Sequence, residues 1–124
     1  MITDDKRVVT QPDIPHAEPK MGKVAVIYTT PETVIDDYAR LLDLADYQTA
    51  LTPNIETFLK VNISWQHYYP ACSSAPWQID GVAQKLQADG FDKLTAAHNG
   101  TVVVNADEGR EKNKHGVVED RLGL

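Results

Sequence analysis

Strand-like and helix-like stretches alternate between residues 23 and 97, and this alternation constrains the fold more than any other feature. Lys23–Thr29 is a continuous run rich in β-branched residues, which is typical of a parallel-sheet strand covered on both faces. Thr30 and Pro31 then suit the start of a helix, and apolar residues follow at helical spacing to about Asp46.

A second strand and a second helix come next. Phe58–Ser64 alternates apolar and polar side chains, so we expect one buried face and one polar face. The following helix begins at Pro76 and ends at Asp89-Gly90, because glycine adopts the left-handed backbone that stops a helix. The polar face of the strand carries Lys60, Asn62 and Ser64.

Lys93–Ala97 is the third predicted strand. An order of strand, helix, strand, helix and strand requires right-handed crossovers and therefore a parallel sheet. The predicted fold is an α/β, Rossmann-like domain: an open parallel sheet of three to four strands with flanking helices.

The residues after the third strand favour a loop followed by a short helix. Asn99-Gly100 is a hairpin signal, but Thr101–Val104 could form either a loop or a short strand. Asn105, with Glu108 three residues later, predicts a capped helix that runs to about Lys114.

The two ends of the chain differ in character. Val117-Val118 looks like a strand that the chain has no room to complete, so we expect a domain truncated at its carboxyl end. Residues 1–22 hold three of the seven prolines and show no sustained period, which predicts an extended or disordered tail. The length then suits a single α/β domain over residues 23–124.

Charge and composition exclude several partners. Eighteen acidic against twelve basic residues give a net charge of -6 without a basic cluster, which argues against nucleic acid. The chain lacks the run of roughly 18 apolar residues that a membrane span needs. Cys72 is the sole cysteine and cannot form an internal disulfide, and no apolar signal core follows the charges near the amino terminus, so we expect a cytoplasmic protein.

Ligands of open parallel sheets bind outside the carboxyl ends of the strands. Three segments should meet at that rim, namely Thr29-Thr30, Asn62–Ser74 and His98-Asn99. The loop Ser64–Gln78 is dense in aromatic and hydrogen-bonding groups, including Trp77 and Gln78, which suggests a binding loop. Its structural alternative is an ordered loop packed onto its own domain.

Cys72 and His98 form the candidate catalytic pair. Cys72 lies just before the second helix, whose dipole would stabilise a thiolate, and His98 could reach it across adjacent strand ends. The alternative is that the cysteine is a small packing residue.

Ser73, Ser74, Lys60 and Asn62 are candidate contacts for a polar or anionic ligand. The serines could cradle an anion or cap the second helix, and Lys60 and Asn62 could donate to a ligand or simply face water from an edge strand.

Metal and nucleotide signatures are weak. His67, Cys72, His98 and His115 are ligand types for zinc but lack paired close spacing, so no metal site is predicted. A single cysteine cannot ligate an all-cysteine iron–sulfur cluster. Neither glycine-rich nucleotide fingerprint is present, and Arg110, Glu111, Lys112 and Lys114 are expected to form a solvated face.

The strand Phe58–Ser64, the stretch Pro70–Gln78 and the helix that ends at Gly90 together resemble the amino-terminal part of domain-of-unknown-function family 362. That family opens with a strand ending in Lys-x-Asn, then a Ser/Thr-x-Pro helix start and a helix that ends in glycine. The resemblance covers residues 23 to 116. Members are usually longer and often carry ferredoxin-type segments, so the resemblance implies a redox or iron–sulfur-linked setting.

Two functions follow as hypotheses, and the cofactor and the question of catalysis stay open. In the first, a small polar or anionic molecule binds at the strand ends. In the second, the aromatic loop Trp65 to Trp77 is a non-catalytic interaction or self-association surface. An open sheet edge would also be completed by a partner chain or by a second copy in a homodimer.

Overall fold

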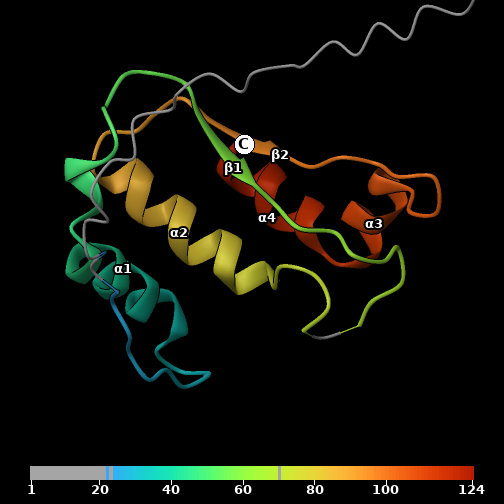
Figure 1. Ribbon diagram of the computed structural model, residues 1–124, viewed down its shortest axis with the longest axis horizontal. Helices are drawn as coiled ribbons and strands as arrows, with labels where there is room; N and C mark the ends of the chain where they lie inside the picture. Colours follow the sequence, from blue (N-terminus) through green and yellow to red (C-terminus); the bar gives the residue numbers. More distant parts are fainter. Residues whose placement is uncertain (1–21, 23, 70) are drawn as a thin grey trace, which may run out of the picture.

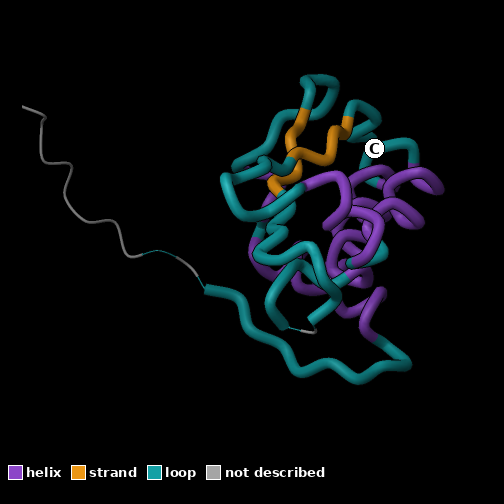
Figure 2. The backbone as a smooth tube through the Cα atoms, turned by 90° about the vertical axis from the view of Figure 1, so that its right-hand side faces the viewer, coloured by secondary structure: helices purple, strands orange, loops and turns teal. Residues whose placement is uncertain are grey.

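The structure combines a two-stranded parallel sheet with four α-helices in the residues that it describes. It is a computed structural model that describes residues 22, 24–69 and 71–124. Of the predicted tail over residues 1–22, only Gly22 is among the described residues. Figure 1 shows the element order, and Figure 2 shows the helices gathered on one side of the strands. The elements are α1 (Val34–Ala45), a 3-10 turn η1 (Tyr47–Thr49), β1 (Thr57–Lys60), α2 (Pro76–Ala88), β2 (Leu94–Ala97), α3 (Ala106–Lys112) and α4 (His115–Leu122).

The strands β1 and β2 pair in parallel, as predicted, in a register that runs from Thr57 opposite Leu94 to Lys60 opposite Ala97. Burial alternates along β1, since Leu59 packs toward the core whereas Phe58 is 63% exposed. The regular strand is shorter than the predicted Phe58–Ser64. The Val61 amide still donates to the Ala97 carbonyl, but the amides of Asn62 and Ser64 donate to serine side chains instead of to a neighbouring strand.

The helix α2 forms as predicted from local signals. Pro76 occupies the first turn, and the side chain of Gln78 accepts a hydrogen bond from the amide of Ala75 at 2.7 Å. Gly90, at a φ of 85°, ends the helix in the left-handed region. The buried side of α2 supplies the centre of the core through Ile79, Ala83 and Leu86.

The helix α1 begins later than predicted because Thr30 and Thr33 first form a turn, in which the amide of Thr33 donates to the Thr30 carbonyl at 3.2 Å. The helix α1 packs directly against α2 through Tyr38. A Cβ added at Gly81 would lie 2.7 Å from the Cβ of Tyr38, so only glycine permits this approach.

The predicted strand over Lys23–Thr29 is not formed. Residues 24–30 pair with no strand of the described chain, and Val24, Val26 and Tyr28 are 83%, 73% and 99% exposed. The segment lies outside α1, on the side away from the two strands (Figures 1 and 2). No strand lies beside this segment, so its backbone forms no strand pairing. The sheet of the described residues therefore has two strands instead of the predicted three to four.

The carboxyl end also differs from the prediction. Asn105 caps α3 as expected, with its Oδ1 accepting from the amide of Glu108 at 3.0 Å, and residues 101–104 form a loop. Val117-Val118 lies in α4 and not in a strand. Lys114 adopts a φ of 66°, which separates α3 from α4, and Val118 then packs with Val61 and Ile79.

Candidate ligand site at the strand ends

The loop after β1 is tied to the strand end by its own serines. The amide of Asn62 donates to Oγ of Ser74 at 3.1 Å, and the Ser74 amide donates to the Asn62 carbonyl at 2.9 Å. Likewise the Ser64 amide donates to Oγ of Ser73 at 3.2 Å. The serine hydroxyls therefore shape the loop. They do not cap α2, because the N-cap residue is Ala75, whose amide donates to the side chain of Gln78.

Cys72 is exposed on this loop, and its carbonyl oxygen accepts from Nδ2 of Asn62 at 3.2 Å. Within the described ranges no hydrogen bond joins Cys72 to His98. The Cys72–His98 pair therefore stays a prediction.

An open cavity of about 610 Å³ lies where the two strands end. His98 enters it directly after β2, and Gln66 enters from the loop after β1. Gly109 of α3 approaches so closely that a Cβ there would lie 2.4 Å from Cγ2 of Ile63, which brings the start of α3 to the same place. The remaining lining residues are Gly100, Thr101, Val102, Val103, Val104, Asn105, Ala106 and Asp107.

Two polar atoms of this cavity lack partners. Oε1 of Gln66 and Nδ1 of His98 are both buried and make no hydrogen bond with any described residue. A buried polar atom without a partner costs about 1–3 kcal/mol, so each such atom needs an explanation. A bound molecule or water that pairs with either atom would remove the cost of burying that atom.

The charge of the lining restricts what fits there. Asp107 is its one charged side chain, and neither lysine nor arginine is among the residues that line the cavity. The pair of Gln66 and His98 offers an acceptor and a ring nitrogen that can donate or accept according to its tautomer. The site therefore suits a neutral or positively charged molecule better than an anion.

Two buried polar side chains, Asn113 and His115, bind backbone carbonyls of the loop after β1. Nε2 of His115 lies 2.6 Å from the carbonyl oxygen of Ser74. Nδ2 of Asn113 donates to the carbonyls of Trp65 at 3.0 Å and Gly109 at 2.9 Å. Sequence reasoning missed Asn113 and treated His115 only as a metal-ligand type, although His115, Val118 and Leu122 share helical spacing that marks one buried face.

Arg110 was predicted to lie on a solvated face, but it joins α3 to α4 instead. Its Nε donates to Oε2 of the buried Glu119 at 2.5 Å, and Nη2 donates to Asp120 at 2.5 Å. These carboxylates raise the pKa of the Arg110 guanidinium, with Asp120 the larger cause. By contrast, Lys112 and Glu108 form a surface ion pair within α3.

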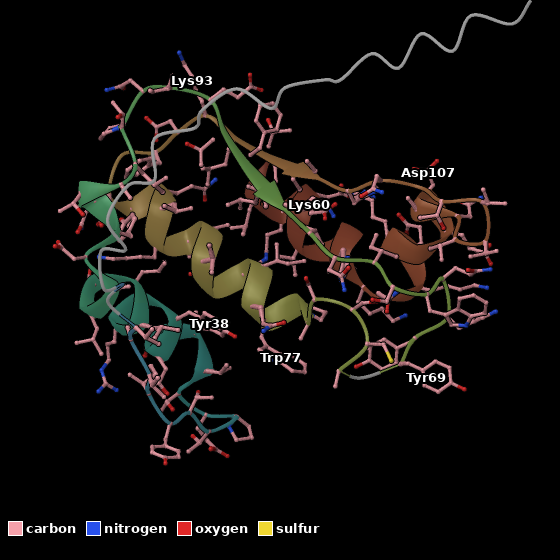
Figure 3. The ribbon with its side chains drawn as sticks, in the orientation of Figure 1. Tyr38, Lys60, Tyr69, Trp77, Lys93 and Asp107 are labelled. Carbon is pink, nitrogen blue, oxygen red and sulfur yellow. The ribbon has the colours of Figure 1, made fainter. Side chains whose placement is uncertain are left out.

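The remaining predicted contacts are spread over other surfaces. Lys60, Ser74 and Gln78 line a groove of about 380 Å³ between β1, α1 and α2, and Nζ of Lys60 donates to the Val61 carbonyl at 3.1 Å. Trp77 is 46% exposed and lines an apolar depression with Thr30 and Val34, while Asn99 is exposed. Figure 3 shows Lys60 on its strand and Asp107 on the side of α3. Of the predicted site residues, His98 alone lines the polar cavity.

Comparisons with known proteins find no matching family model, no matching curated protein and no matching solved structure. The resemblance to domain-of-unknown-function family 362 therefore stays a prediction. In the part of the chain that the structure describes, no three His, Cys, Asp or Glu side chains gather as metal ligands would. Nor does any described helix combine the length and apolarity that crossing a bilayer demands.

Proposed function

We propose that the protein binds a small, neutral or positively charged polar molecule in the cavity at the strand ends. One observation carries the proposal: Gln66 and His98 line the same cavity, and each has a buried polar atom without a partner among the described residues, Oε1 of Gln66 and Nδ1 of His98. Oε1 of Gln66 would accept a hydrogen bond from the ligand, and the His98 ring would donate or accept at Nδ1. Asp107, at the start of α3, would attract an ammonium group.

The place in the fold agrees with this proposal. Open parallel sheets bind ligands beyond the carboxyl ends of their strands, and the cavity lies beyond β1 and β2. A redox or iron–sulfur-linked role rests on the family resemblance alone, and catalysis by Cys72 and His98 rests on their predicted positions at the start of α2 and at the end of β2. Cytoplasmic residence is likewise our proposal, supported by the lone cysteine.

Backbone amide spectra of labelled protein, titrated with ethanolamine, acetamide and acetate, test the proposal. We expect saturable shifts from ethanolamine or acetamide that centre on Gln66, His98 and residues 100–107. Acetate should bind more weakly because it meets Asp107. Saturation by acetate alone, or saturable shifts located elsewhere, would contradict the proposed ligand class.

The second candidate function is an interaction surface on the aromatic loop. Its large rings remain accessible, with Tyr69 60% and Tyr68 49% exposed and Trp65 and Trp77 at 39% and 46%. Aromatic side chains exposed together are typical of protein-binding surfaces. Light scattering over a wide concentration range tests self-association in a homodimer, and Tyr69→Ala should weaken any dimer that uses this surface.

We also infer that the sheet is wider in the functional state, as an open, Rossmann-like parallel sheet of three to four strands. Most sheets have more than two strands, and a third strand would bring this sheet closer to the common size. The free edge of β1 supports this inference, because a further parallel strand can add there.

A further inference from the structure

The outer edge of β1 offers unpaired backbone groups. The amide of Thr57 donates to the Lys93 carbonyl and that of Val61 to the Ala97 carbonyl, both at 2.8 Å, so these residues face β2. Backbone groups alternate in direction along a strand. Those of Phe58 and Lys60 therefore point to the opposite edge, where no strand lies among the described residues.

The same edge is already occupied at the rim. Asn62 faces outward like Phe58 and Lys60, and there Ser74 binds both its amide and its carbonyl. Ser74 thus takes the position that a neighbouring strand would have beside Asn62. The unpaired stretch ends at this serine, which limits an added strand to the part of the edge before Asn62.

A groove of about 380 Å³ runs along this stretch. Tyr38 of α1 and Ile79 and Val82 of α2 form its wall, and Phe58–Val61 forms its edge. α1 already lies against α2, with Gly81 in contact with Tyr38. Two successive right-handed crossovers in one direction place their helices side by side on the same face of a sheet, which is the arrangement seen for α1 and α2.

We propose that residues 24–29 of the same chain dock in this groove as a third parallel strand, in the order 24–29, β1, β2. The segment is rich in β-branched residues, and its Val24, Val26 and Tyr28 side chains are largely exposed. It connects to α1 through the short turn at Thr30, and Thr30 and Trp77 of the first turn of α2 line one depression. The end of the segment therefore already lies near the start of α2.

Docking has one consequence for the sheet edge and one for the strand ends. It would give the backbone N–H and C=O groups of Phe58 and Lys60 hydrogen-bond partners, so the edge would no longer be open to pairing with other chains. It also places the hydroxyls of Thr29 and Thr30 at the rim, beside Ser74. The proposal does not depend on ligand binding in the cavity of Gln66 and His98, so either can fail alone.

Hydrogen exchange on the full chain, with light scattering at the same concentration, tests the docking. We expect the alternate amides of residues 24–29 that point toward β1, and those of Phe58 and Lys60, to exchange roughly 100-fold more slowly than in an unstructured peptide, on a monomer. Exchange of residues 24–29 at the unstructured rate overturns the proposal. Protection found only on a dimer also overturns it, since a second copy would then supply the strand.

Proline substitutions at adjacent positions give a second readout. In a docked strand only one of Val26 and Ile27 points its amide toward β1, so one of Val26→Pro and Ile27→Pro should speed exchange at Phe58 and Lys60 while the other leaves it nearly unchanged. Equal, unchanged exchange at Phe58 and Lys60 in both variants would show that the segment does not pair there.

Discussion

Nε2 of His115 lies 2.6 Å from the carbonyl oxygen of Ser74, although 41 residues separate them in the chain. The His115 side chain is fully buried at the start of α4, and Ser74 holds the loop to Asn62. One ring therefore joins the carboxyl-terminal helix to the rim loop. The position of the loop depends on packing from α4 as well as on its own serines.

Removing this ring should destabilise the whole domain. His115→Ala deletes a fully buried side chain and leaves the Ser74 carbonyl unpaired, so we expect the free energy of unfolding to fall by about 2–4 kcal/mol. Urea denaturation measures the loss. The exposed His67 gives a matched control, and His67→Ala should change the value by no more than about 0.5 kcal/mol. Equal effects of the two substitutions would argue against the contact.

A methyl group at Gly109 should disturb the site as well as the fold. In Gly109→Ala the new Cβ would meet Cγ2 of Ile63 at 2.4 Å and lie 3.6 Å from Cα of Gln66. Overpacking of this kind costs about 1–3 kcal/mol, and thermal unfolding would record it. Gly100→Ala is the control, because its nearest neighbour, the Val104 carbonyl, is 3.6 Å away. We expect that variant to unfold at nearly the wild-type temperature.

Tyr47 should make stability fall at alkaline pH. Burial and the 2.5 Å hydrogen bond to Asp89 raise the pKa of Tyr47 to about 12. An unfolded chain releases this proton near pH 10, so the stabilisation is complete below that pH and is lost as the pH rises through about 12. The difference in unfolding free energy between wild type and Tyr47→Phe should therefore shrink over this interval. A constant difference would be inconsistent with the raised pKa.

Alkylation of Cys72 tests whether it forms a pair with His98. Because the thiol is exposed and makes no hydrogen bond to His98 in the described structure, we expect iodoacetamide to react equally fast with wild type and His98→Ala at pH 7. A clear change of rate in His98→Ala would instead support the catalytic pair that the sequence suggested.

Local signals predicted some elements well and others poorly. Pro76, the apolar stripe and Gly90 define α2 within its own sequence, and the alternation around Leu59 defines the buried face of β1. The run Lys23–Thr29 has strand character, but whether it pairs depends on tertiary contacts that a local pattern does not reveal, and residues 24–29 are unpaired in the structure.

The error at α4 has a similar cause. Two adjacent valines favour a strand locally, whereas burial of Val118 on Ile79 selects a helix. His98 was found from its place after a strand. Gln66 was missed because its lack of a partner is a property of the folded chain alone.

The dissociation constant of ethanolamine, measured in wild type, Gln66→Leu and Asn99→Ala, tests whether Gln66 and His98 bind a polar molecule. Gln66→Leu removes the buried, unpaired Oε1 of the half-buried Gln66 side chain and leaves an apolar side chain of similar size, so it should keep stability near the wild-type value. We predict that it weakens binding at least about tenfold, equivalent to roughly 1.4 kcal/mol, while the exposed Asn99→Ala leaves binding unchanged. Unaltered binding in a stably folded Gln66→Leu variant would contradict the account.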